Sequence, residues 1–267
     1  MASSNDSAPA IRASEVGKVY GRRAALSRVS FTIHEGETVA VVGPSGAGKT
    51  TLLHLLAGII RPDGGDIHLN GRDLAGLTPG EELSRLVGVI HQQLDLVPQL
   101  SVLQNVLAGR LGHWGPARSV VSLVRPRERE TAEMALDRVG LADKLYERTS
   151  RLSGGEQQRV AIARLLLQDP QVILADEPVA SLDPARAADL MGLLAEIAGQ
   201  SGKTLVSSLH SIDLVRKHFS RLIGLRNGGQ LFDLPSADVT GDMMDRLYDL
   251  RGIEEIDTFQ GRDYGES

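Results

Sequence analysis

A glycine-rich segment that follows an apolar run is the feature that most constrains how this chain folds. Residues 38–42 are mostly β-branched and apolar, as expected for a strand buried on both faces of a parallel sheet. The segment Gly43-Pro44-Ser45-Gly46-Ala47-Gly48-Lys49-Thr50 follows directly, and apolar residues then recur at helical spacing over 52–60. A strand, a glycine loop and a helix in this order predict a phosphate-binding loop within an α/β fold.

This loop predicts a nucleotide site. Glycines let backbone N–H groups approach phosphates without a Cβ clash, and the helix that follows adds a favourable dipole. We expect Lys49 to contact the β- and γ-phosphates and the Thr50 hydroxyl to bind Mg²⁺. A chance turn rich in small residues is the alternative, and the flanking strand and helix disfavour it. The predicted nucleotide-binding residues here are Gly43, Pro44, Ser45, Gly46, Ala47, Gly48, Lys49, Thr50 and Thr51.

A second apolar strand, residues 171–175, ends in two acids, Asp176 and Glu177. Ligands of open parallel sheets gather at the carboxyl ends of the strands. We expect Asp176 to hold Mg²⁺ and Glu177 to act as the general base that polarises the attacking water. A surface turn is the alternative, and the phosphate loop upstream makes it the weaker interpretation.

Composition limits the partners and the compartment. The 267 residues carry 29 basic and 34 acidic side chains, so no global positive charge indicates a nucleic-acid partner. The absence of cysteine excludes a disulfide framework or a thiolate nucleophile. No apolar stretch approaches the roughly 20 residues that span a bilayer, and residues 1–10 lack the features of a signal peptide. We therefore expect a cytoplasmic protein that reaches a membrane only through partners.

The pattern of the chain predicts one large domain. Residues 1–10 are expected to form a disordered leader, and 11–235 an ATPase domain that starts with short strands at 11–14 and 29–33. Asn70-Gly71 indicates a hairpin. Residues of about 94–160 are expected to form an inserted helical subdomain, after which strands and helices alternate. Residues 236–267 are left as a C-terminal tail.

A third motif gives these features a family context. The segment Leu152-Ser153-Gly154-Gly155-Glu156 lies between the loop and the two acids. In this order the three motifs resemble the ATP-binding cassette (ABC) family over about residues 10–235. The resemblance implies a P-loop NTPase fold with a RecA-like core, an N-terminal antiparallel β-subdomain and the helical insertion. It also implies ATP hydrolysis by a head-to-tail dimer, in which Ser153, Gly154 and Gly155 contact the ATP of the other subunit.

Three further site residues depend on the resemblance. It implies that Tyr20 stacks on adenine, that Gln92 binds Mg²⁺ or the attacking water, and that His210 contacts the γ-phosphate as a catalytic residue. From the residues alone, Gln92 and His210 are ordinary polar residues at strand ends, and Tyr20 is an ordinary strand aromatic.

Within the family, residues 101–112 and 173–184 are similar to the ATPase subunits of phosphonate importers. This implies a peripheral protein on the cytoplasmic face of the inner membrane, paired with a second and presumed identical cassette. Its other partners would be transmembrane permease subunits and, indirectly, a solute-binding protein. Importers of phosphite or phosphate, an exporter, a cassette acting on nucleic acid and a non-catalytic cassette remain alternatives.

Overall fold

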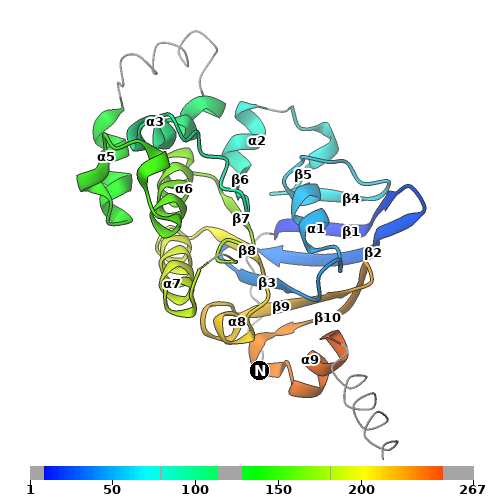
Figure 1. Ribbon diagram of the computed structural model, residues 1–267. Coiled ribbons are helices and arrows are strands. Elements are labelled where there is room, and N and C mark those ends of the chain that lie inside the picture. Colours follow the sequence, from blue (N-terminus) through cyan, green and yellow to red (C-terminus); the bar gives the residue numbers. More distant parts are fainter. Residues whose placement is uncertain (1–8, 79, 114–127, 181, 249–267) are drawn as a thin grey trace, which may run out of the picture.

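The computed structural model describes residues 9–78, 80–113, 128–180 and 182–248, and contains two sheets with helices packed around them (Figure 1). One sheet has six strands in the order β10-β9-β3-β8-β7-β6, and the other has four in the order β2-β1-β4-β5. The strands are β1 (Pro9–Tyr20), β2 (Arg23–His34), β3 (Thr38–Val42), β4 (Gly64–Leu69), β5 (Arg72–Asp73), β6 (Val87–Ile90), β7 (Val172–Asp176), β8 (Thr204–Leu209), β9 (Arg221–Arg226) and β10 (Gly229–Pro235).

The helices flank the six-stranded sheet or extend beyond it (Figure 1). The α-helices are α1 (Lys49–Leu56), α2 (Glu81–Leu86), α3 (Val102–Leu107), α5 (Arg129–Arg138), α6 (Gly154–Gln168), α7 (Pro184–Gln200), α8 (Ile212–His218) and α9 (Gly241–Tyr248). Short 3₁₀ helices are η1 (Leu74–Gly76), η2 (Ala108–His113), η3 (Ala142–Lys144), η4 (Thr149–Arg151) and η5 (Ser236–Asp238).

The six-stranded sheet sets the position of the candidate site. Strands β9, β3, β8, β7 and β6 run parallel, and only β10 is antiparallel to its neighbour. Every residue of β7 and β8 is buried, which explains the apolar run of β7 that precedes Asp176. Because the strands are parallel, the segments after β3, β6, β7 and β8 emerge at one edge of the sheet.

Two hydrophobic cores hold the layers together. One lies between α1, the four-stranded sheet and one face of the central strands, and includes Ile33, Leu52 and Leu55. The other joins the opposite face to α3, α5, α6 and α7, and includes Leu136, Ile162 and Leu194. In Figure 1 the helices α3, α5 and α6 form a separate lobe on the left, and β1, β2, β4 and β5 lie on the right.

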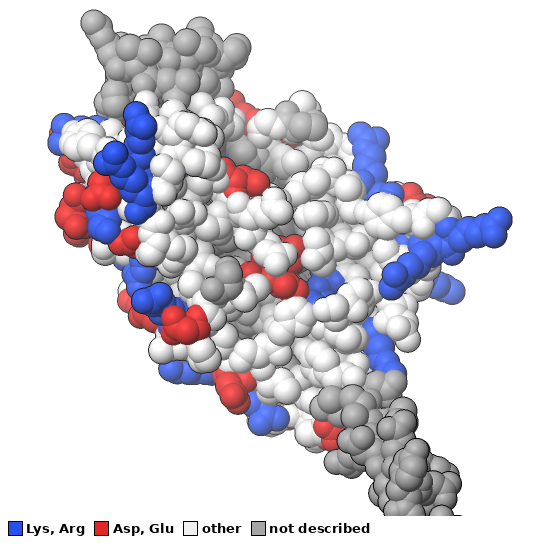
Figure 2. All heavy atoms as spheres, in the orientation of Figure 1, with Lys and Arg blue, Asp and Glu red and all other residues white. Residues whose placement is uncertain are grey.

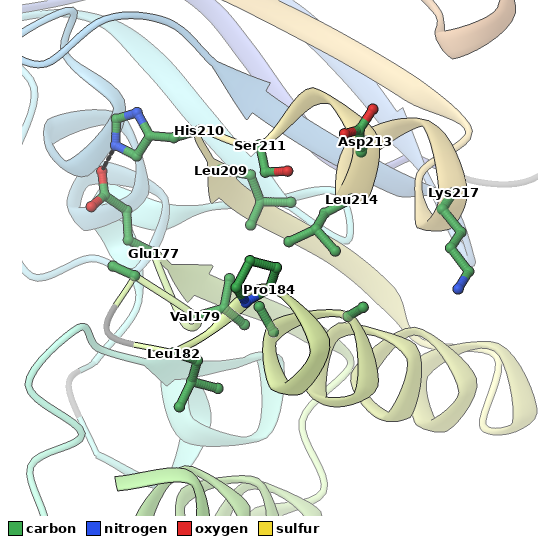
Figure 3. A pocket seen from close by; sticks show the side chains of 13 residues that line it. Glu177, Val179, Leu182, Pro184, Leu209, His210, Ser211, Asp213, Leu214 and Lys217 are labelled. Carbon is green, nitrogen blue, oxygen red and sulfur yellow. Dashed lines mark hydrogen bonds and ion pairs between the residues drawn. The ribbon is translucent and has the colours of Figure 1, made fainter.

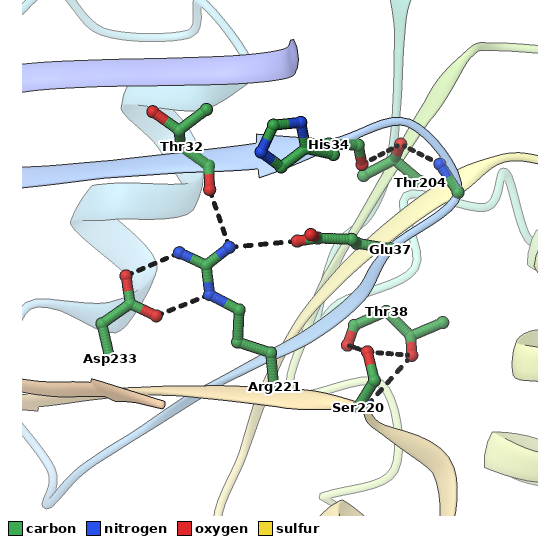
Figure 4. A network of polar contacts seen from close by, with 9 residues as sticks. Thr32, His34, Glu37, Thr38, Thr204, Ser220, Arg221 and Asp233 are labelled. Carbon is green, nitrogen blue, oxygen red and sulfur yellow. Dashed lines mark hydrogen bonds and ion pairs between the residues drawn. The ribbon is translucent and has the colours of Figure 1, made fainter. Parts of the chain in front are cut away.

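A polar network joins the two sheets (Figure 4). Arg221 on β9 donates two hydrogen bonds to the carboxylate of Asp233 on β10, at 2.6 and 2.7 Å. Its remaining nitrogen donates to the Thr32 carbonyl of β2 at 2.7 Å and to Glu37 at 3.1 Å. One guanidinium group therefore fixes the crossing from β2 into β3, the strand that leads to the phosphate loop.

The structure changes some details that the sequence predicts. Strands β1 and β2 have 12 residues each, longer than expected, and Pro9 and Ala10 belong to β1 rather than to a leader. Register shifts interrupt their pairing, so the apolar alternation is broken and conceals the strand length. The Asn70-Gly71 turn between β4 and β5 forms as expected, with both residues at positive φ.

Parts of the expected regions lie outside the described residues. These are residues 1–8 of the leader, 114–127 of the helical insertion and 249–267 of the tail. In the part of the tail that is described, α9 packs Met244 and Leu247 into the core. Within the described ranges, no helix has the length and apolar character needed to cross a membrane.

Candidate nucleotide site

The phosphate loop joins β3 to α1 and depends on glycine at two positions. Gly43 and Gly48 have φ angles of +152° and +106°. A Cβ at Gly43 would lie 2.1 Å from the Leu225 carbonyl oxygen, and one at Gly48 would lie 2.5 Å from that of Ala25. Only glycine fits this path, and within the described part of the chain no side chain caps the start of α1. The first N–H groups of α1 therefore remain available to an anion.

Lys49 is folded against the loop that precedes it. Its ammonium donates to the carbonyl oxygens of Gly43 at 2.8 Å and Pro44 at 3.3 Å. The Glu177 carboxylate lies 3.8 Å away, and the Lys49 side chain is only 4% exposed. Burial lowers the pKa of Lys49, while Glu177 and Asp176 act in the opposite direction. The lysine charge is thus held at the centre of the loop.

Asp176 ends β7 and is buried beside the start of α1. Its Oδ1 accepts hydrogen bonds from the Thr50 hydroxyl at 3.2 Å and from the Ser208 hydroxyl at 2.7 Å. The hydroxyl and the carboxylate are hard oxygen donors from two different elements, which is the donor set that suits Mg²⁺. Among the described residues there is no group of three or more His, Asp or Glu side chains arranged for a metal. This set fits a cation that also binds phosphate oxygens.

Glu177 follows in a strained backbone conformation, with a φ of +46°. Its N–H donates to the Ser208 hydroxyl at 2.8 Å, and its Oε1 lies 2.5 Å from His210 Nε2. Figure 3 shows Glu177 and His210 at one end of a pocket of about 400 Å³. The pocket continues past Leu182 and Leu214 to Lys217 on α8.

Tyr20 and Gln92 lie on exposed segments. Tyr20 ends β1 and is 53% exposed, and it pairs across the hairpin with Arg23. The Arg23 guanidinium comes within 3.3 Å of an ideal Cβ position at Gly46, which brings this hairpin to the phosphate loop. Gln92 follows β6, whose Ile90 pairs with Ala175, so Gln92 emerges at the same sheet edge as Asp176.

The residues Ser153, Gly154 and Gly155 lie apart from this cluster. Ser153 caps α6, and the two glycines form the first turn of that helix. Ser153 and Gly155 line a second cavity of about 310 Å³ with Arg159, Arg186 and other residues.

Acidic and basic side chains meet near the middle of the face in Figure 2, between the helical lobe and the sheets. The structure therefore brings Lys49, Thr50, Asp176, Glu177 and His210 together, and places the segment 153–155 elsewhere.

The contacts of two residues in this region, Ser208 and Glu156, are not among those expected from the sequence. Ser208 binds both Asp176 and the Glu177 N–H, and its only signal is a pair of serines in an otherwise apolar strand. Glu156 accepts hydrogen bonds from the Ser153 N–H at 2.8 Å and from its hydroxyl at 2.9 Å. The spacing Ser-x-x-Glu is typical of such a capping box, so this pair of hydrogen bonds could have been predicted from the sequence.

Comparison with known proteins decides the family. The model of the ABC transporter family matches residues 26–180. The chain belongs to the ABC transporter ATP-binding family. It has that family's P-loop fold, and ATP hydrolysis coupled to transport is the family's function.

Curated relatives of this ABC cassette carry the name phosphonates import ATP-binding protein PhnC. The protein from Pseudomonas entomophila (strain L48) is 45% identical over 240 residues, covering 89% of this chain and 91% of the relative. That from Anaeromyxobacter dehalogenans (strain 2CP-C) is 48% identical over 246 residues, or 91% of this chain. The chain spans about half of that second relative's length (49%).

Solved cassettes have the same fold. The dimeric post-hydrolysis state of the cassette MJ0796 bound to ADP and Pi gives a TM-score of 0.74 at 32% identity, covering 85% of this chain and 98% of that one. The ADP conformation of the cassette MJ1267 gives a TM-score of 0.77 at 25% identity, covering 92% and 97%.

Proposed function

We propose that this chain is the ATP-hydrolysing subunit of a membrane importer for phosphonates, working as a dimer of two cassettes. The observation that supports the dimer is the separation of Ser153–Gly155 from the phosphate loop and the two acids. One edge of the sheet presents the phosphate loop and the acids, whereas Ser153 and Gly155 line a second cavity between α6 and α7. Two copies facing head to tail would each complete the other's site, and a solved relative with 32% identity is dimeric.

In this proposal the phosphate loop and the start of α1 bind the triphosphate. Residues Gly43 to Thr51 surround the phosphates and, apart from Pro44, supply backbone N–H groups. Lys49 exchanges its contacts with loop carbonyls for the β- and γ-phosphates. Tyr20 stacks on the adenine at the exposed end of β1. Thr50, Asp176 and Gln92 hold Mg²⁺, which neutralises charge on the phosphates when bound.

Hydrolysis then depends on Glu177 and His210. Glu177 takes a proton from water as the water oxygen attacks the γ-phosphorus and the bond to the β-phosphate oxygen breaks. The 2.5 Å contact between His210 and Glu177 holds this carboxylate, and the other ring nitrogen is left to contact the γ-phosphate. Ser153, Gly154 and Gly155 of the second copy contact the same phosphate, so the dimer stays closed only while ATP is intact.

The names of the relatives support phosphonates as the proposed cargo. The Pseudomonas proteins named for phosphonate import match this chain over most of their own length. In this proposal the chain lies on the cytoplasmic face of the inner membrane and binds transmembrane permease subunits, which receive the cargo from a solute-binding protein. The helical lobe passes the motion of the dimer to the permeases. Nucleic acid has no role in this cycle.

Reconstitution with the co-purifying membrane subunits and solute-binding protein tests the function. ATP hydrolysis is measured in proteoliposomes with a phosphonate, phosphite or phosphate, using Glu177→Gln as the inactive control. We expect a phosphonate to stimulate hydrolysis well above the other two anions. Stimulation by phosphite or phosphate alone would overturn the cargo. If no membrane subunit co-purifies and DNA stimulates hydrolysis instead, the transport function is wrong.

A further inference from the structure

An ion pair lies beside the segment Leu152 to Glu156, here called the signature segment, at the start of α6. Lys144, the last residue of η3, binds Oε1 of Glu156, and both side chains are 27% exposed. Asp143 and Glu147 add negative charge around the same ammonium. The Lys144 ammonium therefore contacts the first turn of α6, the helix that Ser153 caps.

The other oxygen of Glu156, Oε2, accepts hydrogen bonds from Ser153. It accepts the Ser153 N–H at 2.8 Å and the Ser153 hydroxyl at 2.9 Å, and the Glu156 N–H points back to the serine oxygen at 3.4 Å. The hydrogen bond from Lys144 and then those from Ser153 lower the pKa of Glu156 to about 2. At neutral pH one ionised carboxylate therefore connects Lys144 to the serine hydroxyl.

The negative charge of Glu156 would oppose closure of the dimer proposed above. Ser153 would face the triphosphate of the opposite subunit, and Glu156 lies one hydrogen bond away from Ser153. Like charges at such separations repel each other, most strongly where water is excluded. A glutamine would close the same capping box without the charge. Glu156 therefore needs a counter-ion that a glutamine would not.

We propose that Lys144 is a positioning residue for closure of the dimer, because it offsets the charge of Glu156 and holds this carboxylate beside Ser153. This inference rests on the proposed function of Ser153–Gly155. Lys144 itself touches neither ATP nor the reacting atoms. Its effect passes through Glu156, so it should disappear when Glu156 is made neutral.

A double-mutant cycle in the Glu177→Gln background tests this. The ATP concentration for half-maximal dimerisation is measured by sedimentation velocity, and ATP binding to the dilute monomer by equilibrium dialysis. We expect Lys144→Met to raise the dimerisation concentration by roughly tenfold, the effect of losing one charge-assisted contact. Binding to the monomer should not change, because the phosphate loop is in the other lobe. Lys144→Arg should stay close to the parent.

In the Glu156→Gln background, we expect Lys144→Met to have no further effect on dimerisation. Lys203→Met is the matched control, since Lys203 pairs with Asp169 at the opposite end of α6, at 2.7 Å. Thermal melting of each variant shows that it is folded. The inference is overturned if Lys144→Met dimerises like the parent, or if its defect is the same size with Glu156→Gln present. A Glu177→Gln parent that binds ATP and never dimerises would instead overturn the proposed function, and this inference with it.

Discussion

At the scale of single residues, Ser208 organises both acids of the candidate site. Its hydroxyl donates to Asp176 and accepts the N–H of Glu177, whose φ of +46° is unfavourable for a residue with a side chain. One buried hydroxyl thus holds the proposed metal-binding carboxylate and the proposed base in a fixed relation.

We predict that Ser208→Ala lowers the free energy of unfolding by about 1–3 kcal/mol, because it leaves the buried Asp176 oxygen and the Glu177 N–H with fewer partners. Hydrolysis should fall more than ATP binding. Urea unfolding and phosphate release measure the two effects. Ser207→Ala is the control. Among the described residues its hydroxyl bonds only to backbone carbonyls of Ala175 and Ser208, so its loss should cost less and spare hydrolysis.

Glu156 gives a prediction on pH. Its pKa is about 2 in the folded chain and 4.5 as the ordinary value, so the folded state favours the ionised form. Its contribution to stability is therefore complete above about pH 4.5 and is lost as the pH falls towards 2. The difference in free energy of unfolding between the parent and Glu156→Gln should stay level above pH 4.5 and shrink steadily from pH 4.5 to pH 3, because the unfolded chain binds the proton before the folded chain does. Urea titrations at each pH would contradict this if the difference stays constant.

At the scale of elements, Asn105 of α3 holds the path from β6 to the signature segment. It is buried and bonds both the N–H and the carbonyl of Val97, at 2.8 and 3.0 Å, and the Thr149 hydroxyl at 2.7 Å. Thr149 begins η4, which leads to Ser153. The segment that follows Gln92 and the segment that precedes Ser153 are thus fastened to one side chain.

We predict that Asn105→Leu costs about 1–3 kcal/mol of stability, because Thr149 and Val97 lose polar partners. It should also slow hydrolysis while ATP binding to the monomer is unchanged. Gln104→Leu, which only removes the capping box of α3, should cost about 1 kcal/mol and leave hydrolysis in place. Equal loss of hydrolysis in both variants would contradict this role for Asn105.

Local patterns in the sequence were sufficient to predict the elements around the loop. The apolar runs of β3 and β7 and the glycines of the loop are all short-range signals, and the structure has each of them. Contacts across strands were beyond such reasoning. Ser208 is 32 residues from Asp176 in the chain, and only the parallel pairing of β7 with β8 brings them together. The length of β1 and β2 was missed because bulges break their alternation.

At the scale of the whole molecule, the account depends on two copies. The sheet edge and the helical lobe each carry part of what ATP needs, and the Arg221 network fixes the first sheet against the second. In the proposed dimer the chain responds to ATP through the relation between copies, which is how the cassette would transmit work to membrane subunits.

The most direct test of this central claim is the molar mass of Glu177→Gln in solution, measured by light scattering after size exclusion with ATP, with ADP and without nucleotide. Loss of the carboxylate should stop hydrolysis and leave ATP binding intact. We predict twice the chain mass of 28.6 kDa with ATP, and the single chain mass in the other two conditions and in the variant that also carries Lys49→Ala. A mass of one chain at saturating, bound ATP would contradict the shared site.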